Sequence, residues 1–512
     1  MDASPSRLFP DSLTPRTLPT PRNSRSQKLK FSSHHFATLD DYLSNIGFGL
    51  YQIRAYLILG FVLINDGAEV VVLSFLLAIL NKEWGLSTAE IGFLGSVIFA
   101  GFFVGSLFAG KISDIYGRKK SLIYVVLALY VFAMWSAFVY SYPMLVFVRT
   151  IFGFLVGLQF PMCFTYLAEI TPKEGRGKFL VLAGGFFTLG ELLACLVAFF
   201  TLESSSSGNW RALFIWVAQP ALLCGLGIAY LMHESPRHEI IVKKNYKEGR
   251  RILESMFLAN GMGLELNEED EEKLKHWVEN TEHFKTEEVA SIRTLFKGKT
   301  KYITAYLWPT WMVLSLVYYG MVYILPMSLD AIHDNENHNE SEENRTGEIW
   351  GMVSAIISEI PSIVLGYFIV EHDMLGRKNS MVYGFIGSGF ALLFAGLFSS
   401  FVFWVSIARG ILNCAFIIAS PYTTELYSTK VRTTGLGMAS AASRIGGVIM
   451  PWIALPLLSV GPTAPYLGFV LFCGIGAFCC YKLPYDTTNK ELDFELKDMS
   501  NGREGNSAIL LH

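Results

Sequence analysis

Charged residues are scarce in this sequence. Asp, Glu, Lys and Arg together make up 17% of its 512 residues, whereas soluble domains average roughly 25%. The formal net charge of -3 is nearly neutral, so nothing in it indicates a nucleic-acid partner. Hydrophobic residues account for 52% of the chain. This balance disfavours a string of soluble domains and indicates a protein that lies in a lipid bilayer.

Catalytic and metal-binding patterns are also lacking. All seven cysteines lie inside apolar segments, without the spacing of metal ligands. Lys297-Gly-Lys-Thr300 resembles the end of a phosphate-binding loop, but Arg293 stands where that loop needs its first glycine. No nucleophile–base spacing occurs. We therefore expect neither an enzyme, nor ATP-driven transport, nor a bound metal or cofactor.

Apolar segments long enough to span a bilayer are abundant. A helix needs about 20 apolar residues to cross the hydrocarbon core. Twelve stretches meet that length, at residues 53–80, 91–110, 121–139, 143–168, 179–201, 211–232, 302–327, 348–369, 380–398, 401–424, 433–457 and 464–482. Residues 1–45 lack an apolar core, which excludes a secretory signal peptide and predicts a disordered cytoplasmic tail.

The loops between these segments differ in charge. Alternate loops hold most of the basic residues, at Lys111, Arg118, Lys119, Lys120, Lys173, Arg176, Lys178, Arg377, Lys378, Lys430 and Arg432. The positive-inside rule places these loops, and with them both termini, in the cytoplasm. The opposite loop after the seventh segment carries two glycosylation sequons, at Asn339 and Asn344. A glycosylated outer loop predicts the plasma membrane or an endomembrane vesicle.

The two halves of the chain repeat the same motifs. Asp114-Ile-Tyr-Gly-Arg-Lys follows the second segment, and Asp373-Met-Leu-Gly-Arg-Lys follows the eighth. Glu169 and Arg176 flank the end of the fourth segment, as Glu425 and Arg432 flank the end of the tenth. Matched motifs at matched positions indicate a duplicated unit, with a binding site where its two copies meet.

The sequence therefore predicts an all-α membrane protein. Its twelve transmembrane helices form two pseudo-symmetric six-helix bundles, at residues 46–232 and 301–484. A cytoplasmic linker with short helices joins the bundles at residues 233–300, and residues 485–512 form a second disordered cytoplasmic tail.

Longer motifs give a family resemblance. Gly110-Lys-Ile-Ser-Asp-Ile-Tyr-Gly-Arg-Lys-Lys120 resembles the major facilitator superfamily signature between helices two and three. Glu234-Ser-Pro-Arg237 resembles the motif that closes helix six in the sugar and organic-ion branches. Asp66-Gly-Ala-Glu69 and Ser358-Glu-Ile-Pro361 are similar to motifs of synaptic-vesicle-two-related transporters, which lie close to organic cation and nicotinate-type carriers. The resemblance implies the major facilitator fold and a monomer. Glu191 replaces the glutamine pairs of hexose carriers, which disfavours sugar transport.

The repeated loops also carry a predicted function. In the family that they resemble, their charge pairs latch the outward-open state, so rocking between states breaks them. The pairs expected here are Asp114 with Arg118 and Glu169 with Arg176. The full set of predicted latch residues is Asp114, Gly117, Arg118, Glu169, Arg176, Asp373, Gly376, Arg377, Glu425 and Arg432.

Ionisable residues near the middle of a span cost roughly 2.5–3.5 kcal/mol each on insertion scales, so each calls for a reason. Five occur, at Asp66, Glu69, Glu191, Glu359 and Arg444. Four acids against one Arg indicate either bound protons or a cationic substrate. Arg444 could instead hold a carboxylate, as a nicotinate-like anion would require. Pairing between helices without a transport role stays an alternative.

Two tyrosines complete the predicted site, and two arginines stay outside it. Tyr318 and Tyr319 could stack on a ring or a cation, although aromatic residues are abundant in this chain and plain packing is the favoured explanation. Arg149 and Arg409 fall in the outer third of their segments, where snorkelling or bonding between helices would account for them.

These patterns predict a secondary active transporter of a small charged organic solute, either an organic cation or a nicotinate-like ion, coupled to protons. The alternative is a non-transporting glycoprotein of the same fold that acts as a receptor or trafficking partner. Two intact copies of the Asp-x-x-Gly-Arg-Lys loop favour transport, because a protein that does not rock has little use for a latch.

Overall fold

The computed structural model describes residues 38–173, 176–204, 206–263, 266–285, 292–298, 300–336, 342–369, 376–398, 400–427 and 432–487. Within them, twelve helical spans are long and apolar enough to cross a membrane. They are α2 (Leu50–Glu83), α3 (Thr88–Tyr116), α4 (Arg118–Ala137), α5 (Tyr142–Ile170), α6 (Arg176–Thr201), α7 with α8 (Trp210–Val217 and Gln219–Leu231), α11 (Thr300–Glu336), α12 with α13 (Glu342–Ile357 and Glu359–Ile369), α14 (Arg377–Leu397), α15 (Phe401–Leu426), α16 (Arg432–Leu458) and α17 (Ala464–Tyr481). Each overlaps one predicted segment.

Two spans are interrupted. The sixth breaks between α7 and α8 at Ala218, two residues before Pro220, and the eighth breaks between α12 and α13 at Ser358, three residues before Pro361. Proline has no backbone N–H to donate into the preceding turn, so it favours such breaks. The second break brings Glu359 to the first position of α13.

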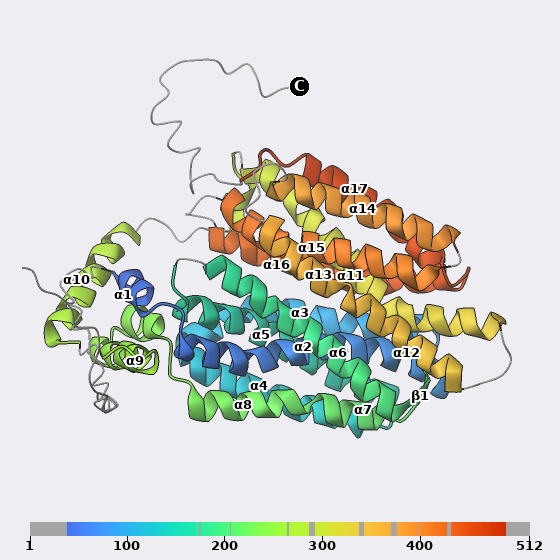
Figure 1. The fold of residues 1–512 in the computed structure, drawn as a ribbon, viewed down its shortest axis with the longest axis horizontal. Coiled ribbons are helices and arrows are strands. Elements are labelled where there is room, and N and C mark those ends of the chain that lie inside the picture. Colours follow the sequence, from blue (N-terminus) through green and yellow to red (C-terminus); the bar gives the residue numbers. More distant parts are fainter. Residues whose placement is uncertain are drawn as a thin grey trace, which may run out of the picture.

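The spans form two bundles that lie side by side (Figure 1). We call the bundle of α2–α8 the N-half and that of α11–α17 the C-half. The halves meet where α3 packs on α16, where α6 packs on α12 and α13, and where α2 packs on α11. The central windows of α2 and α11 are 89% and 94% buried, whereas the other spans do not exceed 56%. These two helices therefore form the centre of the molecule.

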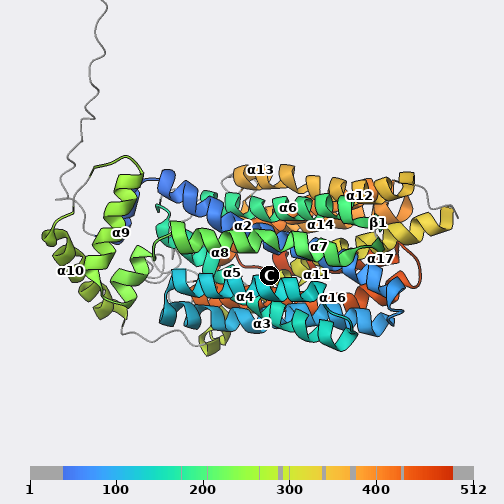
Figure 2. The same ribbon diagram turned by 90° about the horizontal axis from the view of Figure 1, so that it is seen from below.

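Short elements mark the two ends of the bundles. Helices α1 (Leu39–Ile46), α9 (Tyr246–Ala259) and α10 (Glu268–Lys285) gather at one end, on the left of Figures 1 and 2. We call this the linker end. The π-helix η2 (His238–Val242) packs on α9 and α10 there, and the 3-10 helix η3 (Ile292–Phe296) packs on α11 and α16. Strands β1 (Leu202–Ser204) and β2 (Ser207–Gly208) pair at the opposite end, called the far end.

Helix α1 corrects one expectation. Residues 1–45 were predicted to be a disordered tail, but Leu39–Ile46 form a helix that begins with a capping box between Thr38 and Asp41. Leu39, Tyr42, Leu43 and Ile46 are buried on one face of that helix. The Tyr42 hydroxyl donates to Asp270 of α10 at 3.0 Å. Spacing of three and four residues is the helical signal that identifies this face. Residues 1–37 lie outside the described residues.

Glycines set how closely α3 and α5 approach. A Cβ added at Gly105 would lie 2.1 Å from the Phe154 carbonyl oxygen, and one at Gly157 would lie 2.3 Å from that of Phe102. Real Cβ atoms do not approach that closely, so the two backbones touch only because glycine lacks a side chain. This contact fixes the crossing of the second and fourth spans.

Candidate functional site

Asp66 lies in the middle of α2 and is 5% exposed. Its Oδ1 atom accepts a hydrogen bond from Gln159 of α5. Its Oδ2 atom is buried and has no hydrogen-bond partner among the described residues. Both side-chain polar atoms of the neighbouring Asn65 are in the same situation. Buried polar atoms without a partner are costly, so they point to a ligand, a proton or a water at this place.

Glu69 lies one turn along the same helix and is paired within the N-half. Arg149 of α5 donates from Nη1 to Glu69 Oε2 at 2.9 Å. The Arg149 guanidinium also lies over the rings of Phe214 and Phe152, at 4.2 and 4.9 Å from their centroids. The remaining Nε and Nη2 atoms of Arg149 and Oε1 of Glu69 are buried without a partner in the described structure.

Arg444 reaches this region from the C-half. Its guanidinium carbon lies 3.6 Å from the ring centroid of Phe102 and 5.6 Å from that of Phe160, both in the N-half. Its Nη1 atom donates to the Tyr319 hydroxyl at 3.1 Å, and its Nε atom has no partner among the described residues. A cation held against aromatic faces keeps its charge in an apolar surrounding. Arg444 therefore brings a positive group of the C-half close enough to Asp66 for an electrostatic interaction.

A second buried cluster joins the two halves. Arg409 of α15 donates from Nε to Glu359 Oε1 at 2.8 Å and from Nη2 to Glu191 of α6. Glu359 also accepts from the Tyr318 hydroxyl at 2.6 Å and from Thr188 Oγ1 at 2.9 Å. Arg409, Glu191 and Glu359 are each at most 1% exposed. Glu191 and Thr188 belong to the N-half, so this cluster is a bond between the bundles.

The structure corrects how the charges were counted. Arg149 and Arg409 were predicted to snorkel or to form bonds between helices, and the structure shows the second, because both are buried and paired with acids on other helices. Four acids therefore face three guanidinium groups rather than one, and the excess falls from three negative charges to one. An acid and a base on different helices give no local signal in a sequence. Gln159 and Asn65 were also missed, although a polar amide in mid-span is a signal that could have found them.

The latch of the N-half forms around Arg118. Its guanidinium pairs with Asp114 and donates from Nε and Nη2 to Glu169 Oε1, at 3.2 Å in each case. The expected pair of Glu169 with Arg176 is wrong. Helix α5 ends at Ile170 and the chain becomes extended at Thr171, which turns Arg176 away to its own partners.

Those partners of Arg176 belong to the linker end. Arg176 donates to Asp40 of α1 at 3.1 Å, and Arg237 donates to the same carboxylate oxygen at 2.7 Å. Partial burial raises the pKa of Asp40, but the guanidinium groups of Arg237 and Arg176 outweigh it and hold the pKa below its ordinary value. Asp40 thus clamps α1 to the N-half.

The C-half repeats the latch in outline. Arg377 pairs with Glu425, as Arg118 pairs with Glu169. Of the other predicted residues, Asp373 lies outside the described residues and Arg432 is described only as the first residue of α16. Asn339 likewise lies outside them, and Asn344 is described only as part of the first turns of α12.

A carboxylate caps the helix after each latch. Glu234 accepts from the backbone N–H of Lys119 at 2.9 Å, and Asp486 accepts from those of Arg377 and Lys378 at 3.1 and 2.9 Å. Gly117 and Gly376 precede these helices at φ 95° and 64°, where a side chain would meet the capping acid. Both copies therefore need glycine at this position.

Among the residues that the structure describes, the polar bonds between the halves lie from mid-span to the far end. At the far end, Asp330 accepts from Lys82 at 2.9 Å and from Ser206 Oγ at 2.7 Å. Further in, Ser96 Oγ donates to the Val448 carbonyl at 2.8 Å. The Glu191–Arg409 pair lies deepest. The far end is therefore fastened between the bundles, while the described latch pairs at the linker end each stay within one half.

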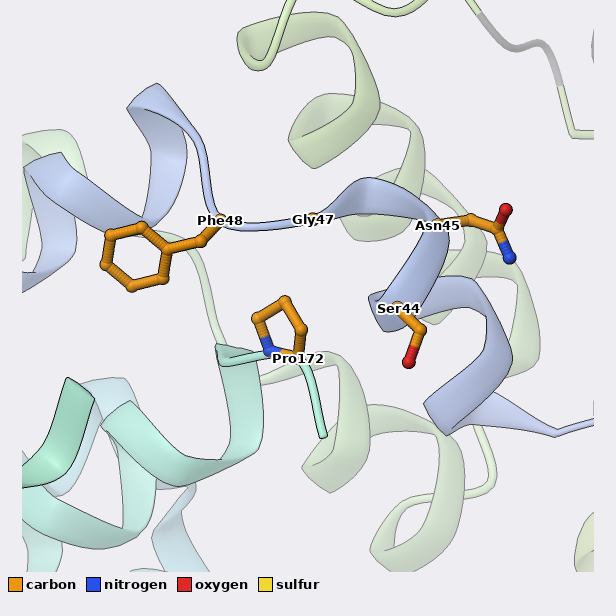
Figure 3. Close-up of a pocket in the computed structure, with 5 residues that line it drawn as sticks. All are labelled: Ser44, Asn45, Gly47, Phe48 and Pro172. Atoms are coloured by element: carbon orange, nitrogen blue, oxygen red, sulfur yellow. The ribbon is translucent and has the colours of Figure 1, made fainter. Parts of the chain in front are cut away.

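A pocket of about 440 Å³ opens at the linker end (Figure 3). It is lined by Ser44, Asn45, Gly47, Phe48 and Pro172, where the turn from α1 to α2 faces the end of α5. The Phe48 ring also stacks on Phe179 at 3.7 Å. No charged side chain lines this pocket, so it does not match the site predicted for a charged solute.

Comparison with known proteins identifies the family. Residues 35–495 match the family described as "Sugar (and other) transporter". The chain belongs to this family of transporters. It is 28% identical to a synaptic vesicle 2-related protein of Xenopus laevis, over 89% of this chain and 82% of the relative. It is also 28% identical to organic cation/carnitine transporter 7 of Arabidopsis thaliana, over 89% and 95% of the two chains.

The solved structures agree on the fold. An inward-open conformation of the xylose transporter XylE from E. coli superposes with a TM-score of 0.66 at 19% identity, over 88% of this chain and 99% of that chain. The prediction of two pseudo-symmetric six-helix bundles of the major facilitator fold is confirmed, as is the resemblance to the synaptic-vesicle-two-related branch. Members of this family are integral, multi-pass membrane proteins that transport small molecules. This chain is therefore a transporter rather than an enzyme.

Proposed function

We propose that this transporter moves a small charged organic solute by rocking its two halves about a site between Asp66 and Arg444. The observation that carries the proposal is Asp66 Oδ2, a buried carboxylate oxygen without a partner among the described residues, on a helix at the centre of the molecule. An ionised carboxylate in an apolar setting favours a cation beside it. The name of the Arabidopsis relative, an organic cation/carnitine transporter, supports this class of substrate.

Arg444 makes solutes that carry a carboxylate possible substrates as well. Its planar fork suits a carboxylate, and its Nε atom has no described partner. A solute that carries both an ammonium group and a carboxylate could then bind Asp66 with one end and Arg444 with the other. A nicotinate-like anion would use Arg444 and leave Asp66 to a proton. The bonds that fasten the far end support alternating access, because opening that end requires the Lys82–Asp330 and Ser206–Asp330 contacts to break.

The test is uptake into proteoliposomes of three labelled probes: tetraethylammonium, carnitine and nicotinate. We expect Asp66→Asn to lower tetraethylammonium and carnitine uptake by about 100-fold, since an ion-to-dipole change at a buried contact costs about 2–3 kcal/mol. Glu203→Gln, at an exposed position in β1, is the matched control and should keep full uptake. Melting temperature should change little in either variant.

Arg444→Gln separates the substrate classes. We expect it to lower carnitine and nicotinate uptake by roughly 10- to 100-fold, because a charge-assisted hydrogen bond contributes about 1.5–3 kcal/mol. Tetraethylammonium, which has no carboxylate, should be affected least. Undiminished uptake in Asp66→Asn would overturn the assigned site. Absence of uptake of all three probes by the unmodified protein would overturn the proposed substrate class.

A further inference from the structure

The Glu191–Arg409–Glu359 cluster holds an unequal number of charges. Two carboxyl groups share one guanidinium, and all three side chains are buried. Glu359 has three donors, from Arg409, Tyr318 and Thr188. Glu191 has one donor, Arg409, and its Oε1 atom is buried without a donor in the described structure, while the Glu191 carboxyl also lies within hydrogen-bonding reach of the Glu359 carboxyl. The Glu359 carboxylate therefore has enough donors to stabilise its negative charge, whereas the Glu191 carboxylate does not.

The groups packed around Glu191 do not supply the missing charge. On its own helix, α6, the nearest polar or titratable side chains are Thr188 and Cys195, one turn away on either side. Helix α11 contributes the Tyr318 hydroxyl, α13 contributes Glu359, and α15 contributes Arg409. Arg409 is thus the one cation among the described groups that face this carboxyl. A second unit of positive charge has to come from outside the protein.

We propose that Glu191 binds the coupling proton of the transport cycle, on Oε1, and that this proton releases the bond between the halves. The inference rests on the transport function proposed above and names the group that couples it to protons. The proton comes from water on one side of the membrane and forms an O–H bond with the Glu191 carboxylate. It returns to water on the other side when that bond breaks, so the step needs no further reactant.

The coupling follows from which half each group belongs to. Arg409 and Glu359 lie in the C-half, and Glu191 lies in the N-half. When Glu191 is ionised, separating the halves would leave a buried carboxylate without its counter-ion, which is strongly unfavourable. When Glu191 is protonated, Arg409 remains neutralised by Glu359 within its own half. The halves then part without exposing an unpaired charge, so proton occupancy controls the change of state.

The experiment uses protons alone. Purified full-length protein in proteoliposomes on a solid support is exposed to a jump from about pH 7.5 to about pH 5.5 without any organic solute, and the transient charge displacement is recorded. We expect a transient in the unmodified protein and in Glu203→Gln, the control variant at an exposed position. We expect its loss in Glu191→Gln, which cannot bind the proton, and its retention in Glu191→Asp. An unchanged transient in Glu191→Gln would overturn the proposal.

Glu359→Gln provides a second, directional test. It removes the competing acid and leaves Glu191 as the one counter-ion of Arg409, so Glu191 should hold its proton less tightly. The transient should then need a pH lower by about one unit, since a nearby like charge shifts a titration by that order. A shift in the opposite direction, or none, would contradict the assignment. If the transients behave as expected but no organic probe is taken up, the substrate site fails while the proton site stands.

A structural role alone predicts a different pattern. If the cluster only held the bundles together, Glu191→Gln would lower the melting temperature and reduce solute exchange and proton-driven accumulation alike. If Glu191 binds the coupling proton, carnitine exchange at equal pH on both sides should persist in Glu191→Gln. A pH gradient should then no longer drive carnitine accumulation in this variant beyond what exchange alone gives. Equal loss of both activities, with the transient intact, would overturn the inference.

Discussion

The N-half and the C-half carry the same motifs but hold their central arginines in different ways. In the N-half, Arg149 pairs with one acid, Glu69, from the same bundle. In the C-half, Arg409 pairs with Glu359 of its own bundle and with Glu191 of the other. The first pair can stay intact while the bundles move. The second pair joins the two bundles. The two copies of the duplicated unit therefore differ at a contact that has to break when the bundles move apart.

The crossings of the matching spans differ as well. In the N-half, α3 and α5 touch backbone to backbone through glycines such as Gly105 and Gly157. In the C-half, the eighth span breaks at Ser358, and Gly410 of α15 meets the Ser358 carbonyl at that break. A backbone contact cannot respond to a proton or a solute, whereas an ion cluster can. Both crossings therefore include a close backbone contact at a glycine, and the C-half adds a buried ion cluster beside it.

The largest expected effect comes from removing the two arginines. Arg409→Met leaves two buried acids without a counter-ion and should lower the free energy of unfolding by about 3–5 kcal/mol. Arg149→Met leaves one such acid and should cost less, near the lower end of that range. Thermal melts in detergent at neutral pH compare the two variants. Equal losses of stability in the two variants would mean that only one acid depends on Arg409 for its counter-ion. The two arginines would then not differ in the way described.

An intermediate effect is expected from the helix crossings. Gly157→Val places a side chain 2.3 Å from a backbone oxygen of α3, so the helices have to move apart, at about 1–3 kcal/mol. Gly366→Ala in α13 is the matched control in the C-half, because the nearest atom to its added Cβ lies 3.6 Å away. That substitution should be neutral or stabilising by up to about 1 kcal/mol, as Ala favours a helix over Gly. Melting temperatures that fall equally would show that the close approach at Gly157 does not decide the loss of stability.

The smallest expected effect concerns the linker end, where the N-half is clamped by α1. The pKa of Asp40 is below its ordinary value in the folded protein. Its contribution is therefore fully present above the unfolded pKa of 3.8 and is lost as the pH falls through the lower folded value. Because the carboxylate is about a third exposed, the contribution is at most about 1 kcal/mol.

Amide hydrogen exchange of α1, compared at acidic and neutral pH after correction for the intrinsic rate, measures this contribution. Asp40→Asn should raise the exchange of α1 at neutral pH and remove its pH dependence. Exchange that stays unchanged in this variant would show that packing of Leu39, Leu43 and Ile46 holds the helix without the clamp.

Part of the candidate site could be predicted from the sequence, because some of its residues differ from their immediate neighbours in the chain. Asp66, Glu69, Glu191, Glu359 and Arg444 were found because an ionisable residue within an apolar run stands out by itself. Their partners could not be found in this way. Arg149 and Arg409 lie near the ends of their segments, where a charge needs no explanation, and Arg176 turns to Asp40 because α5 ends in an extended residue.

The sequence by itself determined the number of spans, the duplication and the family, because a bilayer imposes about 20 apolar residues on every helix and a repeat preserves its motifs. Only the tertiary structure decided which charges meet. Whether Arg409 joins the halves or stays within one depends on residues 218 positions apart in the chain, Glu191 and Arg409, being brought together by packing. Such contacts follow from the way helices cross, which local spacing does not specify.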